Sequence, residues 1–276
     1  MKTVRIIKLR SLTDELIAEL KERKLYIKPD DLGYFTFTNW TDERIARFIE
    51  TVQKYGVEWV DRVAYNIYER QDIEKIEAVH VWVFLPYVKV SLDPHLNSTN
   101  PAFDHEHACQ RCGMPQRQIG PLHVKCKGPL PKKRTIFEPV GDGAWLIKDE
   151  LKEMMEKEKF TGLSFRQVIA HKTGMPVPGL WQMFPDSELP TILDKESYER
   201  FGISKNCSCE QPLVGYKNGL PLKYPVKIRD YLMDFNRTGE WFHISHGRYV
   251  LSSRMAIWLI DNKVGNILFE PVIIES

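Results

Sequence analysis

The segment that decides the fold of the second half of the chain runs from Trp145 to Ile169 and reads WLIKDELKEMMEKEKFTGLSFRQVI. A second segment, from Tyr249 to Ile273, aligns with it without gaps at an offset of 104 residues and reads YVLSSRMAIWLIDNKVGNILFEPVI. Apolar residues occupy the same eleven positions in both segments, and Lys159 coincides with Lys263. We interpret the two segments as copies of an internal repeat.

Each copy has the pattern of a strand, a helix and a second strand. After three apolar residues, further apolar residues recur at the i, i+3, i+4 spacing of one helix face. Asp149 and Ser253 are predicted to be the helix N-caps, because a side-chain oxygen can accept a hydrogen bond from the first turn. Gly162 and Asn266 are predicted to end the helices, because both tolerate the left-handed conformation. Units this small cannot bury an apolar face alone, so we expect the copies to pack together or onto a shared sheet.

The first hundred residues alternate between strand and helix patterns. Ser11 is predicted to cap a first helix and Thr41 a second, which Gly56 ends. His80 alternates with apolar neighbours, so we expect a paired core or surface histidine rather than a metal ligand. Runs of β-branched and aromatic residues predict strands at residues 4–9, 34–38, 63–68 and 78–84.

The prolines and asparagines of residues 92–108 indicate a linker or long loop. We therefore expect an α+β protein with mixed sheets and packed helices, divided into two regions. The N-terminal αβ region would span residues 1–100. The C-terminal region, residues 101–276, would contain the two repeat copies at 145–169 and 249–273.

Four of the five cysteines lie in two close pairs. Cys109 and Cys112 enclose two residues and are followed by Gly113, while Cys207 and Cys209 come later in the chain. Paired thiolates are typical ligands of a tetrahedral zinc ion. We predict that these four cysteines hold a structural Zn²⁺ that clips the second half of the chain together.

Other interpretations of the cysteines stay open. Cys109 and Cys112 could form a redox pair, or the thiols could be small buried apolar residues. Four thiolates would close the metal site, which argues against a catalytic zinc. A nearby residue could also replace one of the four ligands, and the candidates are Cys126, His105, His107 and His123.

Composition and motifs exclude several function classes. The chain has 276 residues with 39 basic and 37 acidic side chains, a net charge of +2, which argues against a nucleic-acid or membrane binder. We expect no signal peptide, and the sequence has no apolar run of membrane-spanning length. Together with the paired thiols, this favours a cytoplasmic protein. It also contains no P-loop, dinucleotide-binding glycine fingerprint, HExxH or GxSxG motif.

Two further groups of side chains are candidates for function. His243, His246 and Arg248, with Glu240 nearby, could bind phosphate or act as acid and base, although a polar turn explains them more simply. Aromatic residues in loop-like or edge segments could form a contact patch or belong to the core. These residues are Trp181, Phe184, Trp241 and Phe242.

The combination of features resembles the double-CXXCG motif family of bacterial proteins, which is associated with immunity to polymorphic toxins. The matching parts are Cys109 to Gly113, Asp234 to Phe242, and the last repeat copy with Phe269 to Val272, so the likeness covers roughly residues 105–276. The family has a second CXXCG, where this chain has Cys207-Ser208-Cys209-Glu210 without glycine.

The resemblance implies a non-enzymatic binding protein, an immunity protein that neutralises a cognate toxin by direct contact, with zinc as a structural element. The alternative function is a zinc-containing enzyme that acts on a phosphorylated or nucleic-acid substrate.

Overall fold

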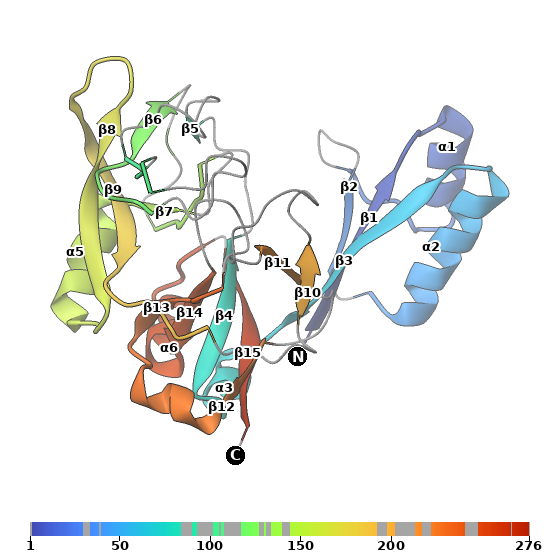
Figure 1. Cartoon of the computed structure of the whole chain (residues 1–276). Helices are drawn as coiled ribbons and strands as arrows, with labels where there is room; N and C mark the ends of the chain where they lie inside the picture. Colours follow the sequence, from blue (N-terminus) through green and yellow to red (C-terminus); the bar gives the residue numbers. More distant parts are fainter. Residues whose placement is uncertain are drawn as a thin grey trace. The chain divides into compact units, whose positions relative to one another are not determined.

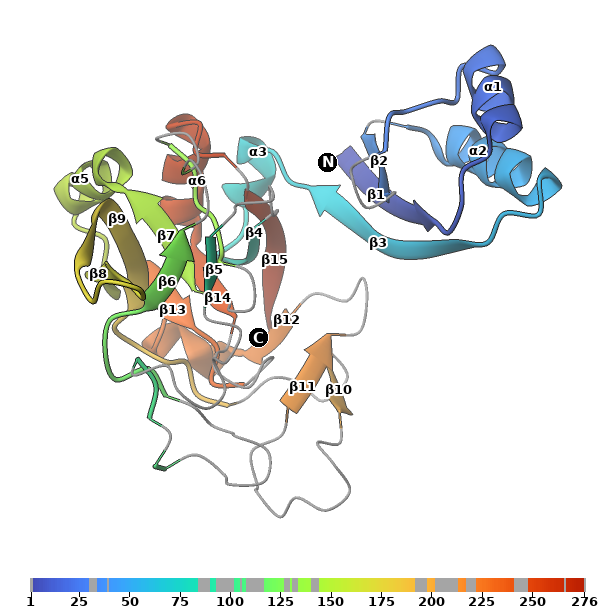
Figure 2. The same cartoon turned by 90° about the horizontal axis from the view of Figure 1, so that it is seen from above.

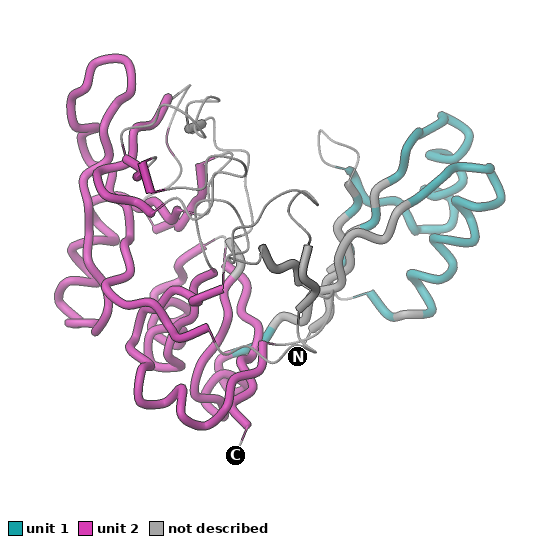
Figure 3. Tube along the Cα trace, viewed as in Figure 1, with its two compact units in different colours: residues 1–69 teal, residues 70–276 magenta. Residues whose placement is uncertain are grey.

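The chain forms two compact units, Met1–Glu69 and Arg70–Ser276, coloured separately in Figure 3. The boundary between the units lies between Glu69 and Arg70, whereas the sequence pattern places it at about residue 100. None of the described helices is long and apolar enough to cross a membrane. The computed structural model describes residues 2–29, 34–38, 40–83, 90–92, 102–104, 106–107, 117–126, 130, 134–139, 144–191, 198–201, 213–216, 222–240, 248–265 and 267–275.

The first unit is a three-stranded antiparallel sheet with two helices, in strand order β2-β1-β3. Its strands are β1 (Lys2–Leu9), β2 (Tyr34–Thr38) and β3 (Trp59–Ile67), and its helices are α1 (Asp14–Glu22) and α2 (Asp42–Lys54) (Figure 1). Alternate residues of β1 and β2 pack against the apolar stripes of both helices. This core contains Ile7, Leu9, Leu16, Leu20, Phe35, Phe37, Ile45, Phe48 and Val52.

Of the two N-caps predicted in the first unit, one is confirmed and one is wrong. The hydroxyl of Thr41 accepts a hydrogen bond from the N–H of Arg44 (3.3 Å), so Thr41 caps α2 as predicted. The prediction of Ser11 as the first cap is wrong. The hydroxyl of Thr13 accepts from the N–H of Leu16 instead (3.2 Å).

The second unit is built on two five-stranded mixed sheets, in the orders β5-β6-β8-β9-β7 and β12-β15-β4-β14-β13. The first sheet contains β5 (Val90–Leu92), β6 (His123–Cys126), β7 (Trp145–Lys148), β8 (Leu163–Ala170) and β9 (Pro176–Pro185). The second contains β4 (Ala78–Val83), β12 (Leu222–Pro225), β13 (Phe235–Arg237), β14 (Tyr249–Ser252) and β15 (Ile267–Glu275). The remaining elements are α3 (Arg70–Ile73), α5 (Asp149–Glu158), α6 (Ser253–Asp261), the 3₁₀ helix η1 (Val226–Asp230) and the pair β10 (Tyr198–Phe201) and β11 (Leu213–Tyr216).

Both repeat copies are strand–helix–strand units, β7-α5-β8 and β14-α6-β15. In each sheet a third strand, β9 or β4, lies between the two repeat strands and is antiparallel to both. A fourth strand, β6 or β12, then pairs in parallel with the second repeat strand. α5 packs on β7 and β9, and α6 packs on β14 and β4, as Figures 1 and 2 show. Four strands of each sheet therefore have the same arrangement, and the fifth differs, since β5 lies beside β6 in the first sheet and β13 beside β14 in the second.

The register of the central strands confirms this equivalence. Gln182 of β9 pairs with Leu146 and Arg166, and His80 of β4 pairs with residues 250 and 270, which lie 104 positions later. The buried clusters correspond as well. The matched pairs are Leu122 with Leu222, Val124 with Tyr224, Leu146 with Val250, Val168 with Val272, and Leu180 with Ala78.

The central strands differ in where they come from along the chain. β9 follows β8 through a tight turn in which the N–H of Gly174 donates to the carbonyl of Ala170 (2.9 Å). β4 comes instead from residues 78–83, far before the rest of its copy. Because β4 lies inside the second sheet, it belongs to the second unit together with both repeat copies. The boundary between the two units therefore lies before β4.

The two copies pack against each other and lie in separate sheets. The rings of Trp145 and Tyr249, which are equivalent residues, have centroids 4.6 Å apart. Thr135, before the first copy, pairs with Gly265 of the second copy. In the reverse direction, the N–H of Phe235, before the second copy, donates to the carbonyl of Thr161 of the first copy (3.1 Å). Such reciprocal contacts are those of an isologous interface, here formed within one chain.

The ends of the repeat helices differ from the prediction. Asp149 and Ser253 are the first helical residues, and the N-caps are Lys148, without a side-chain bond, and Ser252, whose hydroxyl accepts from Met255 N–H (3.2 Å). The left-handed residues that follow the helices are Lys159 (φ 52°) and Lys263 (φ 54°). Gly162, three residues further on, also has a positive φ (73°), and Asn266 lies outside the described residues.

Candidate functional site

The four predicted zinc ligands, Cys109, Cys112, Cys207 and Cys209, lie outside the described residues, so the zinc site stays a prediction. Cys126 belongs to β6. Within the described ranges, no group of three or more His, Cys, Asp or Glu residues is placed to hold a metal ion.

The described residues on either side of the first cysteine pair lie next to each other. Phe103 pairs antiparallel with Gln118, and the N–H of Asp104 donates to the carbonyl of Arg117 (2.8 Å). The stretch that carries Cys109 and Cys112 therefore starts and ends at one place. Such closure suits a loop that presents two ligands to one ion.

Asp104 holds His107 in a defined orientation within that stretch. The carboxylate accepts hydrogen bonds from the N–H groups of His107 and Glu106 (both 3.1 Å), and its second oxygen lies 2.7 Å from His107 Nδ1. The bonds from His107 hold the pKa of Asp104 below its usual range. A histidine whose Nδ1 donates to a carboxylate can offer Nε2 to a metal, an arrangement common around bound zinc. His107 therefore fits the replacement ligand that the sequence leaves open.

The alternative catalytic group is described only in part. His243 and His246 lie outside the described residues. Glu240 and Arg248 flank the stretch that carries them, and Thr238 joins its ends. The N–H of Thr238 donates to the carbonyl of Arg248 (2.7 Å), and its hydroxyl accepts from Arg248 N–H (2.8 Å).

Glu138 is a titratable group near this stretch that sequence reasoning missed. Burial raises the pKa of Glu138 to about 7, although the charge of Arg248 and a hydrogen bond from Trp145 Nε1 (3.1 Å) oppose the shift. A carboxyl group that titrates near neutral pH can exchange protons in function. No local sequence pattern signals it, because the residues that interact with it, Trp145 and Arg248, come from other parts of the chain.

His80 is a buried core histidine, one of the two placements that the sequence leaves open. Its Nδ1 lies 3.5 Å from Glu270 Oε2, and burial lowers the pKa of His80 while Glu270 opposes that shift. It occupies the same sheet position as Gln182, which is also buried and exchanges two amide hydrogen bonds of 2.7 Å with Gln118. At the centre of each sheet a buried polar side chain, His80 or Gln182, is thus paired with a partly buried one.

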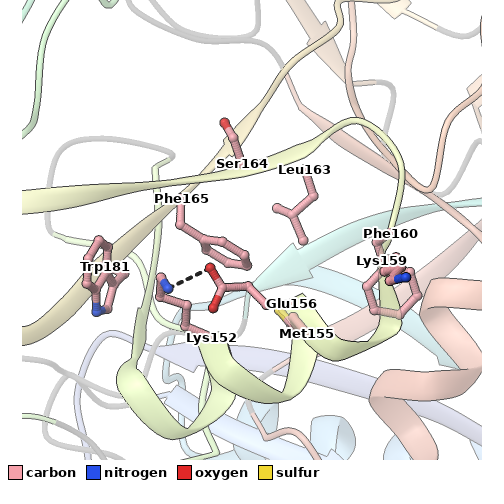
Figure 4. A pocket seen from close by; sticks show the side chains of 9 residues that line it. All are labelled: Lys152, Met155, Glu156, Lys159, Phe160, Leu163, Ser164, Phe165 and Trp181. Carbon is pink, nitrogen blue, oxygen red and sulfur yellow. Dashed lines mark hydrogen bonds and ion pairs between the residues drawn. The ribbon is translucent and has the colours of Figure 1, made fainter.

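A groove of about 470 Å³ lies between α5 and strands β8 and β9 (Figure 4). Trp181 and Lys152 stand at one end, Phe160 and Lys159 at the other, and Leu163 and Phe165 point from β8 toward the helix. The full lining is Lys152, Met155, Glu156, Lys159, Phe160, Leu163, Ser164, Phe165 and Trp181.

Polar contacts fix the side chains at the Trp181 end of the groove. Trp181 Nε1 donates to Asp149 Oδ1 (2.6 Å). Lys152 Nζ lies 4.6 Å from the ring centroid of Trp181, 5.5 Å from that of Phe165 and 2.6 Å from Glu156 Oε1. An ammonium group over two rings is a favourable cation–π arrangement. The rings are therefore held half-buried beside solvent.

The prediction that Trp181 and Phe184 lie in loop or edge segments is wrong, since both belong to β9, an interior strand. Both are half-buried all the same. Trp181 faces the groove, and Phe184 is covered by the guanidinium of Arg166, whose Cζ lies 3.2 Å from the ring centroid. Trp241 and Phe242 lie outside the described residues.

A signal for the groove exists in the sequence. In the repeat alignment, Lys152 stands opposite Ala256 and Glu156 opposite Ile260, so one helix carries charges where its copy is apolar. Comparing the copies for such differences would have identified α5 as the divergent helix. No family model, no curated protein and no solved structure matches this chain.

Proposed function

We propose that the chain is a non-enzymatic binding protein that neutralises a cognate bacterial toxin by direct contact. The observation that carries the binding function is the groove of the first copy, where half-buried aromatic side chains face solvent (Figure 4). Aromatic side chains of this kind are favoured at the centres of protein interfaces. The toxin as partner comes from the resemblance to the double-CXXCG family, and the paired thiols favour action in the cytoplasm.

In this proposal a structural Zn²⁺ is held by Cys109, Cys112, Cys207 and Cys209, with His107 as the replacement ligand. The ion would tie together two segments that are far apart in the sequence. It would contribute to folding stability, because the unfolded chain does not present a preformed site.

Metal analysis of the purified protein tests the clip. We expect one zinc ion per chain, and we expect Cys109→Ala and Cys207→Ala each to lose both zinc and thermal stability. The zinc content of His107→Ala, with all cysteines intact, shows whether His107 is a ligand. Loss of zinc would mean that it binds the ion, and unchanged zinc that it only lies nearby. Unchanged zinc content in both cysteine variants would refute the clip.

Co-expression tests the function. The chain is expressed together with the product of a neighbouring toxin-like reading frame, and growth and direct binding are measured. We expect growth to be rescued and a complex to form, whereas an unrelated toxin should not be neutralised. A chain that neither protects nor binds contradicts the proposal.

The second candidate is a zinc-containing enzyme that acts on a phosphorylated or nucleic-acid substrate. Glu138 with its raised pKa, and Arg248 beside the stretch that carries His243 and His246, are the observations in its favour. Hydrolysis of p-nitrophenyl phosphate or of single-stranded nucleic acid that disappears in His243→Asn and His246→Asn would support it over the binding function.

A further inference from the structure

The open groove is a property of the first copy and is not required by the shared fold. Register makes Trp181 and Val79 equivalent, since Trp181 pairs with Ile147 and Gln167, and Val79 pairs with residues 104 positions later. Val79 is fully buried under α6, whereas Trp181 is half-buried at the groove. The same backbone thus carries a closed helix–sheet contact in one copy and a groove in the other.

At this contact the helix carries charged residues in the first copy and apolar residues in the second, while the facing phenylalanine is the same in both. Lys152, Glu156 and Phe165 of the first copy correspond to Ala256, Ile260 and Phe269 of the second. Ala256 is fully buried and Phe269 is 5 % exposed, while Lys152 and Phe165 are both half-buried. A copy that only had to pack its helix would need neither the charges nor the half-buried rings.

The polar groups of the groove are satisfied at one end and not at the other. At the Trp181 end, Lys152 is paired with Glu156, and the indole N–H with Asp149. At the Phe160 end, the exposed ammonium of Lys159 has no ion-pair partner in the described part of the chain. The guanidinium of Arg254, whose Cζ lies 4.9 Å from the ring centroid of Phe160, is already paired with Asp234, so Lys159 carries the uncompensated charge at this end. The charge left for a ligand to neutralise is therefore positive.

We infer that this groove binds an acidic segment of the protein partner that carries an aromatic side chain. The aromatic ring packs against Leu163 and Phe165, because offset and edge-to-face ring contacts favour such a neighbour. A carboxylate next to it in the segment pairs with Lys159. A volume of about 470 Å³ lies within the range of about 300–1,000 Å³ for ligand pockets. This inference rests on the proposed binding function.

Three capped tripeptides test the chemistry on the full chain without a toxin. They are Glu-Phe-Glu, Lys-Phe-Lys and Glu-Ala-Glu, and binding is followed by NMR at the indole N–H of Trp181 and the amides of residues 163–167. We expect Glu-Phe-Glu to shift these resonances and to bind at least tenfold more tightly than either of the others. Equal or tighter binding of Lys-Phe-Lys, shifts confined to other residues, or no shifts with Glu-Phe-Glu would each overturn the inference.

The second copy provides the matched control. Lys159→Glu should weaken Glu-Phe-Glu at least tenfold, whereas Lys263→Glu, at the equivalent position, should leave its affinity unchanged. Both side chains are exposed and both follow a helix in the left-handed conformation, so the backbone strain is the same. Equal affinity of the wild type and Lys159→Glu would overturn the inference.

The two proposals fail in different ways. If co-expression shows no protection and no complex, the toxin partner is wrong, while the tripeptide result still reports on the groove. If the toxin binds and Lys159→Glu binds it as tightly as the wild type does, the function holds and the groove is not the contact surface.

Discussion

Gly162 lies where the turn after α5 meets the segment before β13, and its backbone has a φ of +73°. A β carbon at this position would overlap the carbonyl oxygen of Phe235 and come within 2.8 Å of Met233 Cβ. Gly174, in the turn between β8 and β9, has a similar φ of +68° but no atom within 4 Å of such a carbon. Substitution of Gly174 therefore introduces backbone strain alone, whereas substitution of Gly162 adds steric overlap between the copies.

We expect Gly174→Ala to lower the free energy of unfolding by about 1 kcal/mol, the cost of a left-handed residue. Gly162→Ala should lower it by about 3 kcal/mol or more, because overpacking adds to that strain. Urea unfolding of both variants measures the difference. Equal losses would show that the backbone before β13 moves aside without cost.

Also at the residue scale, Glu138 makes the free energy of unfolding depend on pH. Its pKa is about 7 in the folded chain against an ordinary value of 4.5, so the folded state keeps a proton that the unfolded state releases. Its contribution to stability is complete below pH 4.5, declines between pH 4.5 and 7, and is lost above pH 7.

Glu138→Gln should remove this dependence. Between pH 5 and pH 8, the free energy of unfolding of the wild type should fall by about 1–2 kcal/mol more than that of the variant. Denaturant unfolding at several pH values measures both. Parallel curves for the two proteins would mean that Glu138 titrates as an exposed carboxyl group does.

At the scale of elements, Asp234 connects the turn after α5 to the start of α6. Its carboxylate accepts hydrogen bonds from Thr161 N–H (2.9 Å), the Ser252 hydroxyl (2.7 Å) and Arg254 Nη1 (2.7 Å). The aspartate is 7 % exposed. A buried carboxylate with several charge-assisted bonds stabilises the elements that it joins.

Asp234→Ala should therefore lower the free energy of unfolding by about 3 kcal/mol, since buried donors lose their acceptor. The control is Asp261→Ala, which removes an exposed ion pair with Arg70 and should cost at most about 1 kcal/mol. Thermal and urea unfolding report both changes. A loss for Asp234→Ala as small as that of the control would contradict its linking role.

At the scale of the whole molecule, β4 joins a segment near residue 80 to the repeat copy that ends the chain. It pairs with both β14 and β15, so removing it would open the middle of a sheet. Exposed inner edges of two strands are unfavourable, because their backbone groups lose their partners.

A truncated chain that begins at Arg70 should therefore unfold cooperatively. A chain that begins at residue 101 should lack a cooperative transition or unfold at a much lower temperature. Circular dichroism and calorimetry distinguish the two. Cooperative unfolding of the shorter chain at the temperature of the longer one would show that β4 is dispensable.

Local pattern was enough to predict the strands and helices of the two copies but not their exact ends or their partners, and it missed β9. The spacing of Leu151, Met154 and Met155 predicts α5 because a helix face repeats every three to four residues. The caps at Lys148 and Ser252 were missed by one residue, since a strand that continues directly into a helix leaves several polar side chains near the boundary. Trp181 was misplaced because β9 becomes an interior strand only by pairing with β7 and β8, which local spacing does not show.

The sequence by itself determined that two strand–helix–strand copies exist, because apolar spacing is written into neighbouring residues. It also identified the paired cysteines and the duplicated lysines. Only the tertiary structure decided that β4 completes the second copy, that partial burial raises the pKa of Glu138, and that the first copy leaves a groove open. These features depend on which distant segments meet, and strand pairing between distant segments is set by the packing of the whole unit.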